Sequence, residues 1–169
     1  MTSTANTATK TVSIHRVYIK ATPERIWEAI TAPEWNRRYA YKAPSNYDLR
    51  PGGAYRVVST PEMTAFGAPE VLIDGEVIEA DPPRRLVQTW HAYFSAETDA
   101  EGPRRLTWEI TEENGGISRL TVTHELDNAP HTLAAVRGDA KLHEGGGGWD
   151  WILSDLKSFL ESGSSLTES

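Results

Sequence analysis

Residues 141–163 read KLHEGGGGWDWILSDLKSFLESG, which sets four consecutive glycines directly before two tryptophans and an amphipathic segment. From Trp149 onward, apolar residues recur three and four positions apart, as they do along one face of an α-helix. This apolar stripe consists of Trp149, Ile152, Leu153, Leu156, Phe159 and Leu160, and the opposite side carries Asp150, Ser154, Asp155, Ser158 and Glu161. Gly163 is a typical helix stop. We therefore predict a helix over residues 147–162, about 24 Å long and able to cross a sheet.

The glycine run has two interpretations. A glycine loop at the start of a helix can bind phosphate through its backbone N–H groups. A phosphate-binding P-loop, however, needs a lysine and a hydroxyl residue after its glycines and a buried strand before them. Here Trp149-Asp150-Trp151 follow the run, Lys141-Leu142-His143-Glu144 precede it, and no βαβ pattern surrounds it. We therefore interpret the run as a hinge that sets the angle at which the helix starts.

Upstream of the glycines, most of the chain follows a period of two. Residues 11–20 are rich in β-branched residues and predict a first strand, and Thr22-Pro23 then form a typical helix start. Five further strands are predicted at 54–60, 71–80, 84–94, 103–113 and 117–126. Turn residues separate neighbouring strands at Asp81-Pro82-Pro83 and at Asn114-Gly115-Gly116. Antiparallel strands with one apolar face, together with one long helix, predict an α+β layer structure.

Length, charge and composition restrict the class of protein. The 169 residues fit one domain, which we predict over 11–163 between flexible tails at 1–10 and 164–169. A formal charge of −7 disfavours binding to nucleic acid, and the longest apolar runs are too short for membrane insertion. The first ten residues lack the apolar core of a signal peptide, and the chain has no cysteine. These features favour a cytoplasmic location.

Five segments occur in an order that is typical of one superfamily. They are ATPERIWEAITAPEWNRRY (21–39), RPGGAYRV (50–57), DGEVIEADPPRRLVQTWH (74–91), SRLTVTHEL (118–126) and GGWDWILSDLKSFLESG (147–163). In these segments the chain resembles the SRPBCC, or START-like, superfamily. Within it, the chain is similar to the group related to the C-terminal domain of the activator of the heat-shock-protein-90 ATPase.

This resemblance implies a helix-grip fold, in which a curved antiparallel sheet wraps around a long C-terminal helix. Short helices follow the first strand, and a cavity commonly lies between the sheet and the long helix. Members of the superfamily bind lipids or polyketides, cyclise or hydrolyse substrates, or regulate a chaperone, so the fold alone does not fix the function.

Alternation along the strands predicts which residues face this cavity. Trp90, Trp108, Val122 and His124 share the covered face, and Tyr55 and Val57 join them from an earlier strand. Trp27 and Trp149 are expected to approach from the two helices. Aromatic walls with a few polar groups suit a pocket for an apolar ligand, although the same side chains can instead fill the core completely.

The residues give little sign of catalysis or of a cofactor. His124 is either a polar contact or general base inside the cavity, or a hydrogen-bonded residue of the core. The sequence has no metal-binding spacing such as HExxH, no Gly-x-Ser-x-Gly nucleophile and no cysteine, so we predict no metal, no cofactor and no catalytic residue. Whether the protein is an enzyme stays open.

Three functions are compatible with these features. The first is a cytoplasmic module that binds a small hydrophobic molecule between the sheet and the C-terminal helix. The second is a protein-partner regulator that resembles a chaperone ATPase activator domain and acts in the stress response. The third is an enzyme of the polyketide cyclase or hydrolase kind.

Overall fold

The computed structural model describes residues 10–168, so the expected tail at 1–10 lies almost wholly outside the described residues. Its strands form one seven-stranded antiparallel sheet in the order β1-β7-β6-β5-β4-β3-β2. Their bounds are β1 (Val12–Ile19), β2 (Ser45–Tyr47), β3 (Ala54–Val58), β4 (Val71–Asp81), β5 (Arg85–Ala92), β6 (Arg104–Glu112) and β7 (Ser118–Glu125). The six predicted strands are confirmed, and only the three-residue β2 was too short to show a period.

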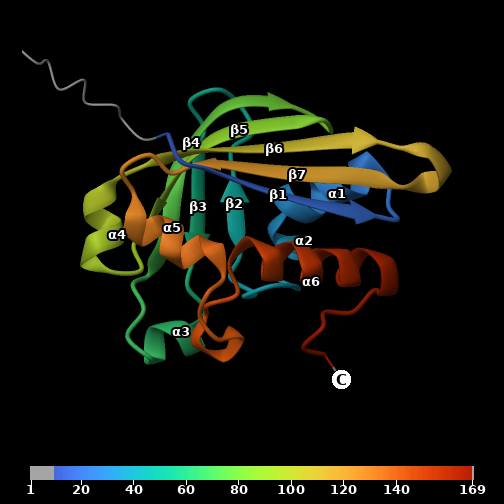
Figure 1. Cartoon of the computed structure of the whole chain (residues 1–169). Helices are drawn as coiled ribbons and strands as arrows, with labels where there is room; N and C mark the ends of the chain where they lie inside the picture. The colour runs from blue at the N-terminus through green and yellow to red at the C-terminus, as the bar shows by residue number, and fades with distance from the viewer. Residues whose placement is uncertain (1–9, 169) are drawn as a thin grey trace, which may run out of the picture.

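The helices lie on one side and at the ends of this sheet (Figure 1). They are α1 (Pro23–Thr31), α2 (Pro33–Asn36), α3 (Pro61–Ala65), α4 (Ala96–Glu101), α5 (Pro130–Arg137) and α6 (Gly148–Ser162), with 3₁₀ turns η1 (Asn114–Gly116) and η2 (Leu142–Glu144). Thr22 caps α1 as predicted, because its side-chain oxygen accepts a hydrogen bond from the Arg25 N–H at 3.2 Å. The predicted C-terminal helix is confirmed as α6, which runs beneath the sheet.

The sheet bends sharply between its two halves, and β4 is where the pairing is irregular. The register of β4 on β5 shifts between Val77 and Glu79, as at a β-bulge, which bends a strand and increases its twist. Nearby, the absence of a side chain at Gly75 lets the two strands approach, since a Cβ there would lie 2.0 Å from the Thr89 carbonyl oxygen. The bend gives the sheet a concave face, on which α6 packs.

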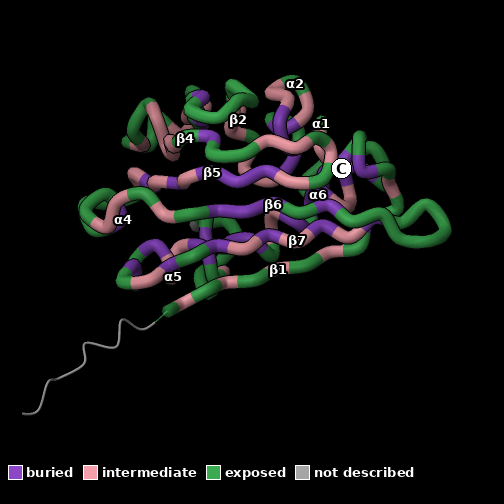
Figure 2. The backbone as a smooth tube through the Cα atoms, turned by 90° about the horizontal axis from the view of Figure 1, so that it is seen from above, coloured by how far each residue is buried: buried purple, intermediate pink, exposed green. Residues whose placement is uncertain are grey.

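The core lies between this concave face and α6. Buried residues alternate with more exposed ones along β7, whereas β5 and β6 each contain a run of three buried residues (Figure 2). From the helix side, α6 buries Trp149, Leu153, Leu156, Phe159 and Leu160. The predicted apolar stripe is thus confirmed except at Ile152, which is half-buried. Alternation with Leu106 and Trp108 predicts Thr107 on the wet face, yet it is only 8% exposed because it lies mid-sheet between Val87 and Thr123.

Asp155 contradicts the predicted polar side of the helix, because its side chain is 0% exposed. Its carboxylate accepts hydrogen bonds from the Ala40 N–H (2.7 Å), the Ser165 hydroxyl (2.7 Å) and the Leu166 N–H. Ser165 is itself buried, so the segment after Gly163 is bonded to the domain rather than detached from it. Apolar periodicity cannot reveal such a contact, since it is made by polar groups alone.

We expect Asp155→Ala to lower the free energy of unfolding by about 2–3 kcal/mol, because it leaves the Ala40 N–H without its charged acceptor and releases residues 164–168. Urea unfolding would measure this loss, with the exposed neighbour Ser154→Ala as the near-silent control. Removing residues 164–169 from the Asp155→Ala variant should lower its free energy of unfolding only slightly further. An unchanged midpoint for Asp155→Ala would contradict the anchoring role.

The glycine run is a tightly bonded joint rather than an open loop. The N–H groups of Gly147 and Gly148 donate to the Tyr41 hydroxyl at 3.1 and 3.2 Å. The same hydroxyl donates to the Gly145 carbonyl at 3.2 Å. Backbone N–H groups that a phosphate would need at the start of α6 are therefore already engaged.

Candidate ligand-binding site

Four of the predicted site residues meet on the concave face. Trp90 of β5, Trp108 of β6, His124 of β7 and Trp149 of α6 are all buried, and we call them the aromatic cluster. Ring centroids lie 4.9 Å apart for Trp90 and His124, and 5.4 Å apart for Trp108 and Trp149. Both pairs pack edge to face, an arrangement that favours aromatic contact. Strand alternation therefore predicted correctly that Trp90, Trp108 and His124 share a face.

A buried glutamine supplies the polar part of this region. Gln88 is 0% exposed, and its side-chain oxygen accepts hydrogen bonds from the Trp108 indole N–H (3.1 Å) and the Tyr47 hydroxyl (2.7 Å). Burial raises the pKa of Tyr47 well above its ordinary value, so its hydroxyl stays a donor. Sequence reasoning missed Gln88, although the alternation of Leu86, Gln88 and Trp90 already placed it on the covered face.

His124 is held in one tautomer by its neighbour on α6. The indole N–H of Trp149 donates to His124 Nδ1 at 3.1 Å, and because an indole N–H can only donate, the proton of a neutral His124 must lie on Nε2. Burial, with the nearby charges of His15 and Arg104, lowers the pKa of His124 to about 3. His124 is therefore neutral near pH 7, and its basic nitrogen is already occupied. This geometry favours a donor role over a general-base role.

The other predicted residues lie at varying distances from the cluster. Val122 is buried on β7, and Tyr55 and Val57 are buried on β3, where Tyr55 stacks on Tyr47 at 4.6 Å between centroids. Trp27 is half-buried on α1, which packs against α2, β2, β6 and α6. Within residues 10–168, no ring contact joins Trp27 to the aromatic cluster.

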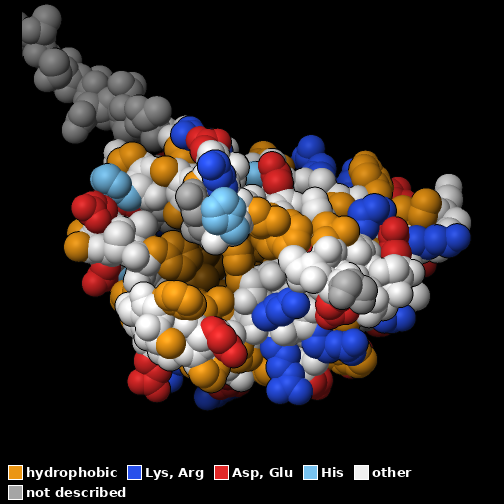
Figure 3. All heavy atoms as spheres, turned by 90° about the horizontal axis from the view of Figure 1, so that it is seen from below, with side chains coloured by type: hydrophobic (Ala, Val, Ile, Leu, Met, Phe, Trp, Pro, Cys, Tyr) orange, Lys and Arg blue, Asp and Glu red, His pale blue; other side chains and the backbone are white. Residues whose placement is uncertain are grey.

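The underside of the molecule is hollowed beside α6. In Figure 3 the hollow opens on the side of α3 and α5, and hydrophobic side chains surround it. Several hydrophobic side chains pack against the core but stay half-buried: Leu72, Ile73, Leu133 and Ile152. A hollow with hydrophobic walls is the kind of surface that an apolar ligand requires.

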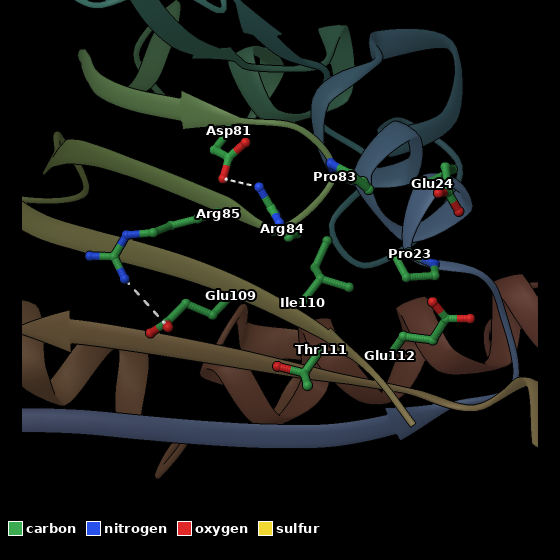
Figure 4. Close-up of a pocket in the computed structure, with 10 residues that line it drawn as sticks. All are labelled: Pro23, Glu24, Asp81, Pro83, Arg84, Arg85, Glu109, Ile110, Thr111 and Glu112. Atoms are coloured by element: carbon green, nitrogen blue, oxygen red, sulfur yellow. Dashed lines mark hydrogen bonds and ion pairs between the residues drawn. The ribbon is translucent and has the colours of Figure 1, made fainter. Parts of the chain in front are cut away.

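A second depression lies near the β4–β5 turn, at the start of α1. This cleft of about 520 Å³ is lined by ten residues, which Figure 4 labels. Four of its six charged side chains pair with each other, Arg84 with Asp81 at 3.0 Å and Arg85 with Glu109 at 3.4 Å. The members of these pairs are well exposed, so we assign no ligand to this cleft.

Solved structures share this architecture. CalU16 from Micromonospora echinospora is 22% identical over 91% of this chain and 78% of its own, with a TM-score of 0.62. MLL2253 from Mesorhizobium loti is 20% identical over 89% of this chain and 97% of its own, with a TM-score of 0.65. PFC0360w from Plasmodium falciparum, described as an HSP90 activator, is 20% identical over 89% of this chain and 87% of its own, with a TM-score of 0.53. At these identities the likeness concerns the fold, and none of the curated proteins matches the chain.

The curved antiparallel sheet around α6 and these likenesses define a helix-grip fold. The family model for Activator of Hsp90 ATPase homolog 1-like proteins matches residues 20–161, and the chain belongs to this family. The predicted fold and family are thereby confirmed. Within the described part of the chain, no helix combines the length and apolar character needed to cross a membrane.

Proposed function

We propose that the protein is a cytoplasmic module that binds a small hydrophobic molecule between the concave face of the sheet and α6. The observation that carries this proposal is the aromatic cluster on the concave face, and the apolar hollow on the underside of the molecule supports it. Trp90, Trp108 and Trp149 offer large, rigid apolar surfaces, and the buried Gln88 and His124 add polar groups that can orient a ligand. A mostly apolar wall with few polar groups selects for an apolar molecule rather than for a sugar or nucleotide.

The most direct test is to extract the purified protein and identify co-purified small molecules by mass spectrometry. Incubating an identified molecule with the protein would then show whether it is also converted, which addresses the cyclase or hydrolase alternative. If neither extraction nor dye binding detects an apolar ligand, the proposal is wrong.

We expect an environment-sensitive apolar dye to bind at micromolar affinity, about −8 kcal/mol, and to quench tryptophan emission. Trp108→Ala and His124→Ala should each weaken binding by about tenfold, or 1.4 kcal/mol, because both remove side chains of the aromatic cluster. Two control variants are compared with them, and circular dichroism first confirms that all four variants are folded. Thr123→Ala alters the other face of β7, and Ile110→Ala creates a cavity elsewhere on β6. Equal effects in all four variants would contradict the location of the site.

A second function, regulation of a protein partner, is favoured by one observation. Phe66, just after α3, is 93% exposed, and Phe94 and Leu142 are 47% and 45% exposed. An exposed side chain as large as that of Phe66 offers apolar surface to a protein partner. A pull-down with purified heat-shock protein 90, combined with an ATPase assay, separates this function from ligand binding. Activation that survives Trp108→Ala but not Phe66→Ser would favour the partner role.

A further inference from the structure

Two buried hydrogen-bond donors near the aromatic cluster lack acceptors. The first is His124 Nε2, which has no hydrogen-bond partner although the residue is 0% exposed. Because Trp149 occupies Nδ1, this nitrogen carries the proton and is a donor. A buried N–H without an acceptor is rare and destabilises the fold, so it needs an explanation.

The second donor is Arg104 Nε, which is also buried and without a partner. The two other guanidinium nitrogens donate to backbone carbonyls, Nη1 to Pro103 at 3.1 Å and Nη2 to Asn128 at 3.4 Å. Within the described residues, Arg104 has no carboxylate partner, whereas its neighbour Arg105 pairs with Glu125 on the other face. A cation that bonds only to neutral oxygens keeps its affinity for an anion.

Strand register brings these two donors to one region of the concave face. Leu106 lies opposite His124, and Arg104 precedes Leu106 by two residues on the same face of β6. Arg104 is therefore diagonal to His124, at a spacing that long side chains can bridge. Trp90 lies opposite Arg104 and also packs against the His124 ring, at 4.9 Å between centroids. The donors thus flank one tryptophan of the aromatic cluster.

A row of rings connects this region with the surface. Phe94 is 47% exposed and packs edge-on against Trp90, with 6.0 Å between ring centroids. Trp90 is 4% exposed and His124 is 0% exposed, so exposure falls stepwise along the row. Because neither orphan donor touches solvent, a ligand must displace side chains of this row to reach them. Phe94, at its exposed end, is the side chain that can move most freely.

We propose that the ligand is an apolar carboxylate, whose carboxylate oxygens accept hydrogen bonds from Arg104 Nε and His124 Nε2 while its apolar part packs on the aromatic cluster. This inference rests on the proposed function and specifies the chemistry of the ligand. A carboxylate supplies both missing acceptors and the missing countercharge together, whereas an alcohol or ester supplies no charge. The neutral state of His124 near pH 7 keeps the Nε2–H donor in place.

Dodecanoate and dodecanol, which share a chain length and differ in the head group, provide the test. Isothermal titration calorimetry should show that the full-length protein binds dodecanoate about tenfold more tightly than dodecanol, as expected for a charge-assisted pair. Arg104→Met should weaken dodecanoate binding much more than dodecanol binding and so abolish this preference. Arg104→Lys keeps the charge but lacks the Nε–H, so it should retain only part of the preference. Arg105→Lys is the matched control and should behave as the wild type.

The outcomes separate this inference from the function on which it rests. Equal affinities for dodecanoate and dodecanol, both unchanged by Arg104→Met, would overturn the carboxylate site while leaving a hydrophobic ligand in place. No binding of either probe would overturn both proposals. If Arg104→Met fails to fold, the wild type and Arg104→Lys still test the carboxylate site. A wild-type preference for dodecanoate over dodecanol of less than about twofold contradicts the site.

Discussion

Gly148→Ala is expected to lower the free energy of unfolding by about 3–5 kcal/mol, although it adds a single methyl group. Gly148 has a φ of +63°, a left-handed conformation that strains any residue with a Cβ. An added Cβ would also lie 2.2 Å from the Val136 carbonyl oxygen and 2.7 Å from the Gly138 nitrogen. Both are backbone atoms at the end of α5, so the clash can be relieved only by moving α5 away from α6.

Gly145→Ala is the matched control for this prediction. Gly145 has a similar φ of +75°, but a Cβ there would meet nothing within 4 Å. This variant should therefore lose only the conformational contribution, about 1 kcal/mol. Urea unfolding of the two variants would separate steric contact from backbone strain. Equal losses of unfolding free energy in the two variants would mean that the packing of α5 against α6 does not require a glycine at position 148.

Besides the predicted setting of the angle at which α6 starts, the glycines allow the end of α5 to approach α6 closely. A run of four glycines predicts freedom of the backbone, but it does not tell which atoms lie against it. Val136 lies in α5 and Gly138 directly follows it, and we did not predict this helix because it has only eight residues and a weak apolar pattern. Apolar periodicity predicts the faces of single helices and strands, and it does not predict contacts between segments that are distant in the chain.

The apolar periodicity of the sequence was sufficient to predict each helix or strand that has one apolar face. Strands β5, β6 and β7 and helix α6 were predicted to within a few residues for this reason. The same alternation brought Trp90, Trp108 and His124 to one face. It failed for Asp155 and missed Gln88, since the burial of a polar residue depends on partners such as Ala40 or Tyr47. The orphan donors at Arg104 and His124 appear only once distances are known.

Leu156→Ala is expected to lower the free energy of unfolding by roughly 2–5 kcal/mol. Leu156 is 0% exposed and lies in the middle of the buried side of α6, where few neighbouring atoms can move in to fill a cavity. The half-buried Ile152, one turn earlier, is the matched control. Ile152→Ala removes a side chain of similar size at an edge that water already reaches, so we expect it to cost distinctly less.

These two variants also test the position of α6 on the sheet. The adjacent residues Asp155 and Leu156 are both buried, so α6 is covered on two sides, by the core on one and by Ala40 and Ser165 on the other. Because the two residues are adjacent on α6, the double variant Asp155→Ala/Leu156→Ala measures how far their losses are coupled. If Ile152→Ala costs as much as Leu156→Ala, α6 is rotated relative to the sheet, and the direction assigned to Trp149 in the aromatic cluster changes with it.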